Sequence, residues 1–176
     1  LLTFLFLVFL EVCSFFVLKF IFADYGIIFD KNKIIQDYND YIKIKHNILG
    51  WDIKSENDGN GARIDHSSFK NSEPCIDVYG NSFTYGHQKG EYAWPSLLSE
   101  HLKCRVRNFG VGAYGSDQAH IKFLLRNNHS KIVFLNHLSE NIIRNLNQFR
   151  NFIYPRSHFE FKPRYVIDDD NLKLIP

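Results

Sequence analysis

Cys75-Ile-Asp-Val-Tyr-Gly-Asn-Ser-Phe-Thr-Tyr-Gly86 is the stretch from which the fold of this 176-residue chain can be predicted. Residues 76–79 form a short run typical of a β-strand, and Gly80 and Gly86 enclose a serine, Ser82. Glycines around a serine let the backbone turn where a side chain would clash. A serine on such a turn lies at the carboxyl end of a strand, where open α/β sheets place their chemistry. An ordinary turn with a solvated serine is the alternative, because turns of small residues are common.

Two further units of strand, loop and helix follow this stretch. Residues 104–109 predict a second strand, and the loop at 108–118 carries three glycines that let backbone amides approach a ligand. Residues 131–136 form a nearly continuous apolar run, which is typical of a central parallel strand. Three such units in succession predict an α/β fold, in which helices pack on the faces of a parallel sheet.

The helices of these units have recognisable starts and apolar faces. Pro95 suits the first position of one helix, and Ser116 and Ser139 can cap the other two. Helical spacing places three sets of side chains in the predicted core. They are Trp94, Leu97, Leu98 and Leu102; then Ala119, Phe123 and Leu124; and then Ile142, Ile143, Leu146 and Phe149.

The turn Gly80-Asn-Ser-Phe-Thr-Tyr-Gly86 resembles the first sequence block of the SGNH/GDSL hydrolases, in which Gly-Asp-Ser precedes small and polar residues. Asn81 stands where that family usually has aspartate. The loop at 108–118 is similar to the second block, Asn-x-Gly-x-x-Gly, and Asn60-Gly-Ala-Arg63 resembles the lead-in of membrane-anchored SGNH-like proteins. The resemblance covers roughly residues 52–176. It implies a flavodoxin-like three-layer α/β/α sandwich, which is incomplete in this chain.

The resemblance also implies roles for individual residues. Ser82 would be the nucleophile, and the backbone N–H of Ala113, with Gly112 as the fallback, would donate to the oxyanion. The third block of the family has an asparagine as a second donor; here Asn141 could fill that role, or Glu140 could be its equivalent, although an ionised glutamate cannot donate a hydrogen bond. An ordinary polar residue at a helix start is the alternative for Asn141. The residues predicted to contact the substrate are Asn81, Gly112 and Tyr114.

In the resembling family a histidine acts as general base, oriented by an aspartate in an Asp-x-x-His block after the last strand. Asp117-Gln-Ala-His120 has this spacing but opens the helix after the second block, so we do not assign it that role. We therefore expect the base to lie outside this chain, and the chain alone to be inactive or nearly so. The resemblance implies a serine esterase acting on a small-molecule or glycan-linked acyl ester. An acyltransferase for cell-surface glycans and a non-catalytic binding domain are the alternatives.

The N-terminal residues 1–23 are apolar apart from Glu11, Lys19 and small polar residues, and their length suits a bilayer span. We interpret them as a membrane anchor or an uncleaved signal, with a buried amphipathic helix as the alternative. An anchor predicts that the domain lies outside the cytoplasm, in a periplasmic or extracellular space. Residues 24–71 are then a lead-in segment and 72–176 a partial hydrolase-like domain. The lack of methionine predicts that the chain is part of a longer protein.

Composition and the remaining segments limit the classes of ligand and cofactor that the protein is expected to bind. A formal charge of +2 without a basic run argues against nucleic-acid binding. Of three cysteines, Cys75 and Cys104 each open a predicted strand, and we expect two buried free thiols rather than a bridge. Residues 161–175 predict a β-hairpin with an acidic turn, for which a solvated turn is favoured over a metal site. No metal or organic cofactor is expected.

Overall fold

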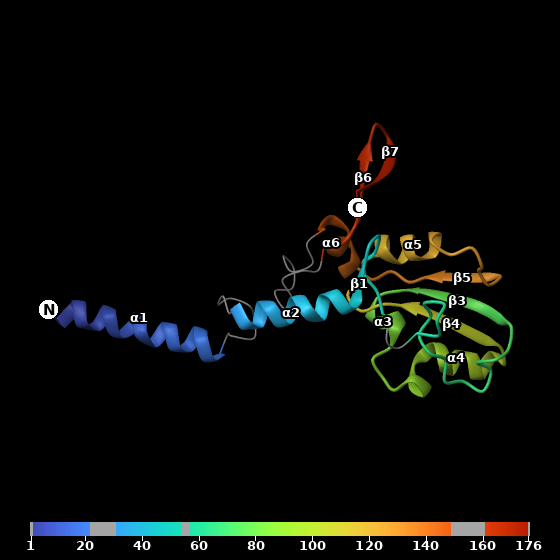
Figure 1. The fold of residues 1–176 in the computed structure, drawn as a ribbon, viewed down its shortest axis with the longest axis horizontal. Coiled ribbons are helices and arrows are strands. Elements are labelled where there is room, and N and C mark those ends of the chain that lie inside the picture. Colours follow the sequence, from blue (N-terminus) through green and yellow to red (C-terminus); the bar gives the residue numbers. More distant parts are fainter. Residues whose placement is uncertain (1, 22–30, 54–56, 149–160, 176) are drawn as a thin grey trace.

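The computed structural model describes residues 2–21, 31–53, 57–148 and 161–175 (Figure 1). Helix α1 spans Leu2–Ile21, and within the described residues it is the one helix long and apolar enough to cross a membrane. None of its Leu2–Lys19 window is buried in the structure, unlike a typical core helix of a soluble protein. An N-terminal helix of this kind is compatible with a membrane anchor or a signal sequence.

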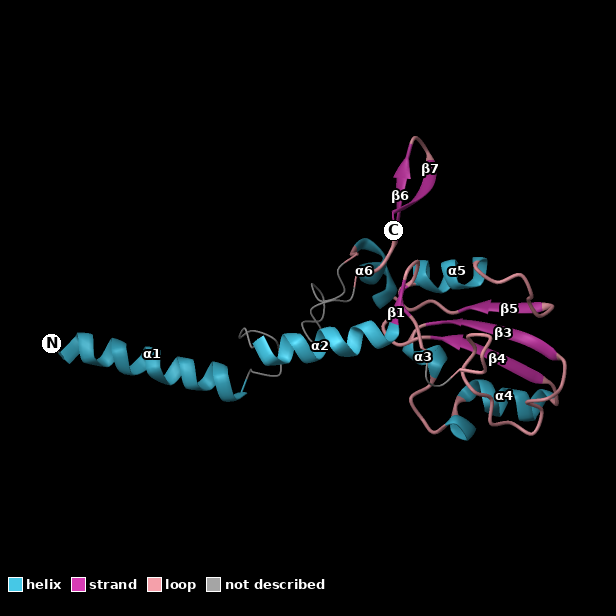
Figure 2. Ribbon diagram, in the orientation of Figure 1, coloured by secondary structure: helices cyan, strands magenta, loops and turns pink. Residues whose placement is uncertain are grey.

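The predicted parallel sheet is present. Within the described residues, the main sheet consists of β3 (Pro74–Gly80), β4 (Arg105–Gly110) and β5 (Ile132–Leu135), parallel and in the order β4-β3-β5 (Figure 2). The prediction that 131–136 is a central strand is wrong for this sheet. β3 is central because its neighbours pair with both of its edges, whereas β5 lies at an edge and leaves Phe134 45% exposed.

Alternation along β3 distributes the core over both faces of the sheet. Ile76 and Val78 cluster with Val106, whereas Tyr79 points to the other face and stacks on Phe109, with ring centroids 4.7 Å apart. Helix α4 (Trp94–Leu102) covers the first face and α5 (Ser116–Leu124) covers the second (Figure 1). The structure is therefore a mixed α/β arrangement with helices on a parallel sheet, as predicted.

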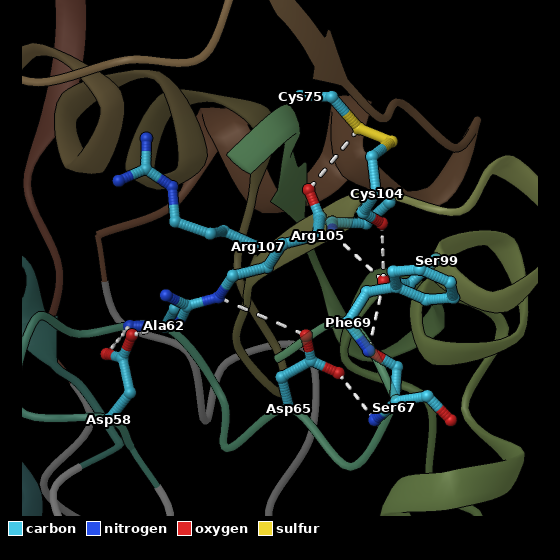
Figure 3. Close-up of polar contacts among 12 residues, drawn as sticks. Asp58, Ala62, Asp65, Ser67, Phe69, Cys75, Ser99, Cys104, Arg105 and Arg107 are labelled. Carbon is cyan, nitrogen blue, oxygen red and sulfur yellow. Dashed lines mark hydrogen bonds and ion pairs between the residues drawn. A yellow bond between two sulfur atoms is a disulfide. The ribbon is translucent and has the colours of Figure 1, made fainter. Parts of the chain in front are cut away.

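The face that α4 buries matches the predicted one only in part: Trp94 and Leu98 pack against the cluster of Ile76, Val78 and Val106, as predicted. Leu97 and Leu102 are exposed, whereas Ser99 is fully buried. The Ser99 hydroxyl donates to Cys104 O at 2.6 Å, accepts from Val106 N at 3.3 Å and lies 3.0 Å from Ser67 Oγ (Figure 3). The helix thus turns a polar residue inward because that residue satisfies the backbone groups at the start of β4.

Helix α6 (Glu140–Leu146) departs further from its predicted orientation. Asn141 and Arg144 are buried, while Ser139 makes no side-chain cap. In α5, Leu124 is exposed and Ile121 takes the inward position. The residues of α6 that were predicted to be buried are instead exposed, and they are Ile142, Ile143 and Leu146; Phe149 lies outside the described residues.

The lead-in segment contributes to the domain core. It contains α2 (Lys31–Ile44) and an antiparallel pair, β1 (Lys45–His46) and β2 (Gly50–Trp51). Leu49 and Trp51 are buried in a cluster with residues of the loop after β4. This packing explains why a stretch without clear periodicity matters to the fold.

The predicted C-terminal hairpin is confirmed. It is formed by β6 (Arg164–Asp168) and β7 (Asn171–Ile175), and Asp169 and Asp170 lie in its exposed turn with positive φ angles. Two short elements complete the described structure, namely α3 (Ser82–Tyr85) and the 3-10 helix η2 (Gly90–Tyr92).

Cys75 and Cys104 form a disulfide, so the prediction of two free thiols is wrong (Figure 3). The reason is the sheet register, in which Pro74 pairs with Arg105 and the two cysteines at the amino ends of β3 and β4 come to a Cα–Cα distance of 6.0 Å. That separation is typical of a bridge. Sequence separation alone could not show that these two strands are neighbours.

Replacing Cys75 and Cys104 together by serine should lower the free energy of unfolding by about 2–4 kcal/mol, because the bridge restricts the unfolded chain across 29 residues. Urea unfolding of the two proteins, each with and without a thiol reductant, measures this loss. Cys13 is not bridged, and Cys13→Ser is the matched control that should leave the midpoint in place. Equal midpoints for the double variant and the unchanged protein would contradict the prediction.

Candidate active site

The loops that follow the three main strands meet at one edge of the sheet. Gly80 pairs with Gly110, and Tyr79 pairs with Leu135, so the carboxyl ends of β3, β4 and β5 are level. The chain leaves β3 toward β4 on one side and returns to β5 on the other. In α/β sheets this change of direction opens a crevice outside the strand ends, where ligands bind.

Ser82 lies at this edge as the first residue of α3. The Asn81 side chain caps α3, with its Oδ1 accepting from Phe83 N at 3.0 Å. α3 can sit directly on the strand ends because Gly80 and Gly110 lack side chains. A Cβ at Gly80 would overlap Thr84 Oγ1, and one at Gly110 would overlap the backbone of Tyr85.

A cavity of about 340 Å³ opens beside the serine. Trp94 lines it, and the indole N–H of Trp94 donates to Phe83 O at 2.9 Å, which fixes that wall relative to α3. Ser82 is half-buried and lines this cavity, so its side chain is accessible to a ligand that enters it. The residues that line the cavity are Ser82, Phe83, Gly86, His87, Gln88, Tyr92 and Trp94.

The loop after β4 holds Ala113 in the left-handed region, with φ 65°. An L-residue other than glycine pays roughly 1–2 kcal/mol for this conformation. Such strain concentrates at functional sites, where the surrounding structure enforces it. Within the described part of the chain, the N–H groups of Ser82 and Ala113 donate no backbone hydrogen bond. Both amides are therefore available to an external acceptor.

Two of the residues predicted to contact the substrate, Gly112 and Tyr114, lie in the loop after β4 and contact Trp51 behind it. Gly112 O accepts from the Trp51 indole at 3.1 Å. Tyr114 is fully buried, its hydroxyl donates to Trp51 O at 2.6 Å, and burial raises its pKa well above the ordinary value. We therefore place Tyr114 behind the site, where it supports the backbone of Ala113, and not on the ligand-facing surface.

A chain of polar side chains links the three loops. Asn81 Nδ2 donates to Asn141 Oδ1 at 3.0 Å, and Asn141 Nδ2 donates to Ser116 Oγ at 3.2 Å. Ser116 Oγ in turn lies 2.7 Å from His137 Nδ1. Asn141 has no exposed surface, and both its Oδ1 and its Nδ2 make a hydrogen bond in this set of side chains. In this arrangement it connects α6 to the cap of α3.

Glu140, the alternative to Asn141, points elsewhere. Its carboxylate accepts from Arg144 Nη2 at 2.6 Å, and Arg144 Nη1 donates to Tyr114 O at 3.0 Å. Asn145 Oδ1 accepts from Ser116 N at 3.0 Å. The structure thus brings Ser82, Asn81, Ala113 and Asn141 to one edge.

Sequence reasoning missed four supporting residues: Ser116 as a link, His137, Arg144 and Asn145. The usable signal was the helical spacing of Asn141, Arg144 and Asn145. It places three polar side chains on one face of α6.

The Asp-x-x-His spacing of Asp117 and His120 does not form a catalytic pair. The Asp117 carboxylate is buried, forms an ion pair with Lys162 and accepts from Gln118 N at 2.8 Å. His120 is exposed and its ring lies 6.1 Å from that of Tyr165. Burial lowers the pKa of Lys162, and the charge of Asp117 opposes that shift. Among the described residues, no imidazole hydrogen-bonds to Ser82 Oγ.

No protein-family model and no curated protein sequence matches this chain.

Proposed function

We propose that this chain is part of a serine acyl-ester hydrolase of the SGNH type, with Ser82 as nucleophile. The observation that carries the proposal is the pair of unengaged amides of Ser82 and Ala113 at adjoining strand ends, with Ala113 held in a strained conformation. Two free N–H donors on adjoining loops beside a serine are the kind of groups that bind the tetrahedral oxyanion of an acyl transfer. The proposal includes the flavodoxin-like sandwich, of which the described sheet and its helices form a part.

The chemistry follows from these positions. Ser82 Oγ attacks the ester carbonyl while a base removes the hydroxyl proton, and the Ser82 and Ala113 amides bind the oxyanion. Collapse of the intermediate expels the alcohol and leaves an acyl-serine, which water then hydrolyses. For Asn141 to act as a second donor, the Nδ2 hydrogen that does not bond Ser116 would have to reach the carbonyl from a buried position.

The proposal needs an Asp–His unit that the described residues do not supply to Ser82. Exposed apolar side chains on two elements of the structure suit such a unit. The edge strand β5 exposes Ile132 and Phe134, and the outer side of α6 exposes Ile142 and Leu146. A parallel strand that is apolar on both sides normally has a neighbour and a covering helix. We place the unit that carries the base against these side chains, beside the loop of His137.

The disulfide and α1 support the proposed location. Disulfides persist in oxidising compartments and are rare in the cytosol. A disulfide at Cys75 and Cys104 in a chain with an apolar N-terminal helix fits a membrane-anchored domain that lies outside the cytoplasm. The substrate would then be a small-molecule or glycan-linked acyl ester on that side of the membrane.

Two other functions share these features. An acyltransferase would use the same serine and pass the acyl group to a cell-surface glycan. A non-catalytic binding domain is favoured by one observation, namely that no imidazole among the described residues bonds to Ser82 Oγ. Covalent trapping separates catalysis from binding, and product analysis separates the two enzymes.

The trapping experiment treats the protein, as it is made in its own cells, with a fluorophosphonate and maps the modified residue by mass spectrometry. We expect modification of Ser82, which lies beside the unengaged amides. Modification of Ser116 instead, whose hydroxyl lies 2.7 Å from His137 Nδ1, would assign the reactive serine to that position and contradict the proposal. Prior incubation with a p-nitrophenyl acyl ester should protect Ser82. Release of free acid without a glycan acceptor supports hydrolysis, and acyl product that appears only with the acceptor supports transfer. If Ser82 is not modified, the serine mechanism is rejected and a non-catalytic binding domain is the remaining candidate function.

A further inference from the structure

A second cavity, of about 530 Å³, adjoins the serine cavity. The two cavities share His87 and Gln88 in their walls, so a ligand that reaches Ser82 can extend across this boundary. The larger cavity lies between residues 63–66 of the lead-in segment and residues 85–91, which follow the nucleophile. The proposed ester chemistry does not use it.

Positive charge predominates in this second cavity. Arg63 and Lys89 line it, opposed by one carboxylate, that of Glu91. His66 and His87 also line it and add imidazole N–H groups that can donate to an acceptor. A concave surface with this charge and these donors attracts an anion and disfavours a cation.

The Arg63 guanidinium is held in place rather than mobile. Its Nη1 donates to Tyr85 O at 2.6 Å and also to Gly86 O, its Nη2 donates to Gln88 O at 2.9 Å, and it lies 4.1 Å from the centre of the Tyr85 ring. These carbonyls take up donors of the guanidinium but do not cancel its charge. Arg63 therefore supplies a fixed positive field, and Lys89 supplies a donor that can adapt to a ligand.

The part of the wall that His66 forms is also shaped by close packing. The His66 ring lies against Gly90, where any added Cβ would overlap the ring. Gly90 begins η2, so this contact joins the lead-in segment to the turn that leads from the nucleophile to α4. Because Arg63 and His66 are both fixed by such contacts, these two groups do not depend on a ligand to bring them to the cavity.

We propose that this cavity binds an anionic group, a carboxylate or a phosphate, that the ester-bearing substrate carries next to its acylated position. The substrate class would then be an acylated acidic glycan or an acylated phosphate-linked polymer. This inference rests on the proposed function for its link to the ester, but the binding itself can be measured without any reaction.

The test uses the full chain in a non-ionic detergent and three probes of matched length: an oligogalacturonate, a glycerol-phosphate oligomer and a neutral cello-oligosaccharide. Titration calorimetry at low salt should show that at least one anionic probe binds about tenfold or more tighter than the neutral one. Added salt should weaken that preference. The probe that binds tells carboxylate from phosphate, and equal binding of all three would overturn the proposal.

Lys89→Glu should weaken binding of the preferred anionic probe by about tenfold or more, since it reverses a charge in the cavity. Lys131→Glu is the matched control, because it makes the same change at an exposed position at the amino end of β5, and binding should stay within about twofold. Lys89→Gln, which removes the charge without reversing it, should give an intermediate loss. Equal effects of Lys89→Glu and Lys131→Glu would show a general charge effect and overturn the proposal.

Failure of this inference is distinguishable from failure of the ester chemistry. Ser82→Ala should bind the anionic probe as tightly as the unchanged protein. Anion binding together with an unmodified Ser82 in the trapping experiment would reject the hydrolase and keep the cavity as a binding site. A reactive Ser82 in a protein that does not prefer the anionic probes would keep the hydrolase and reject the anion-binding cavity.

Discussion

Replacing Ser82 by alanine should abolish hydrolysis of p-nitrophenyl acyl esters by the protein as its own cells make it, with a loss of about 100-fold or more in kcat/KM. The loss is large because the hydroxyl forms the covalent intermediate, and neither the oxyanion amides nor the cavity can replace it. The fold should be unchanged, since Ser82 is only half-buried and the Asn81 side chain caps α3.

Ser139→Ala is the matched control for this variant. Ser139 is an exposed serine at the start of α6 whose side chain makes no cap, so its loss should leave both activity and stability in place. Initial rates with acetyl and butyryl esters, measured beside thermal unfolding, separate chemistry from folding. Equal rates for Ser82→Ala and the unchanged protein would reject Ser82 as the nucleophile, and a non-catalytic binding domain would be the remaining candidate function.

Replacing Asp77 by alanine should lower the free energy of unfolding by about 3–5 kcal/mol, because it leaves a buried guanidinium without its counter-ion. Asp77 has no exposed surface, and its carboxylate accepts from Arg107 Nε at 2.6 Å and Nη2 at 2.8 Å. It also accepts from the Ser130 backbone N–H at 2.9 Å and hydroxyl at 2.8 Å. One residue thus joins β3 to β4 and to the segment before β5.

The contrast with an exposed pair makes this prediction specific. Asp40 and Lys43 form an ion pair of 2.8 Å on α2, but both side chains are more than half exposed. Asp40→Ala should leave the unfolding midpoint nearly unchanged, because water and salt screen such pairs. Urea unfolding of both variants at neutral pH measures the difference. A loss for Asp77→Ala no larger than that for Asp40→Ala would mean that water reaches Arg107.

The strand, turn and loop pattern around Ser82 was readable because it is local. Alternation at Ile76 to Tyr79, glycines where the chain turns, and Pro95 at a helix start each act within a few residues. The C-terminal hairpin was predictable for the same reason. The disulfide was not, because it depends on which strands are neighbours, and that is set by packing across 29 residues.

By itself the sequence determined the apolar N-terminal helix, the strand–loop–helix order and the placement of Ser82 and Ala113 shortly after the ends of strands. Only the tertiary structure decided that β3 is central, that α6 turns Asn141 and Arg144 inward, and that Tyr114 lies behind the site. It also decided that Arg63 faces residues 85–88, which follow the nucleophile. The physical reason is that local conformation follows neighbouring residues, whereas the face an amphipathic helix buries depends on partners. A polar face is buried when, as in α6, its side chains satisfy backbone groups of another loop.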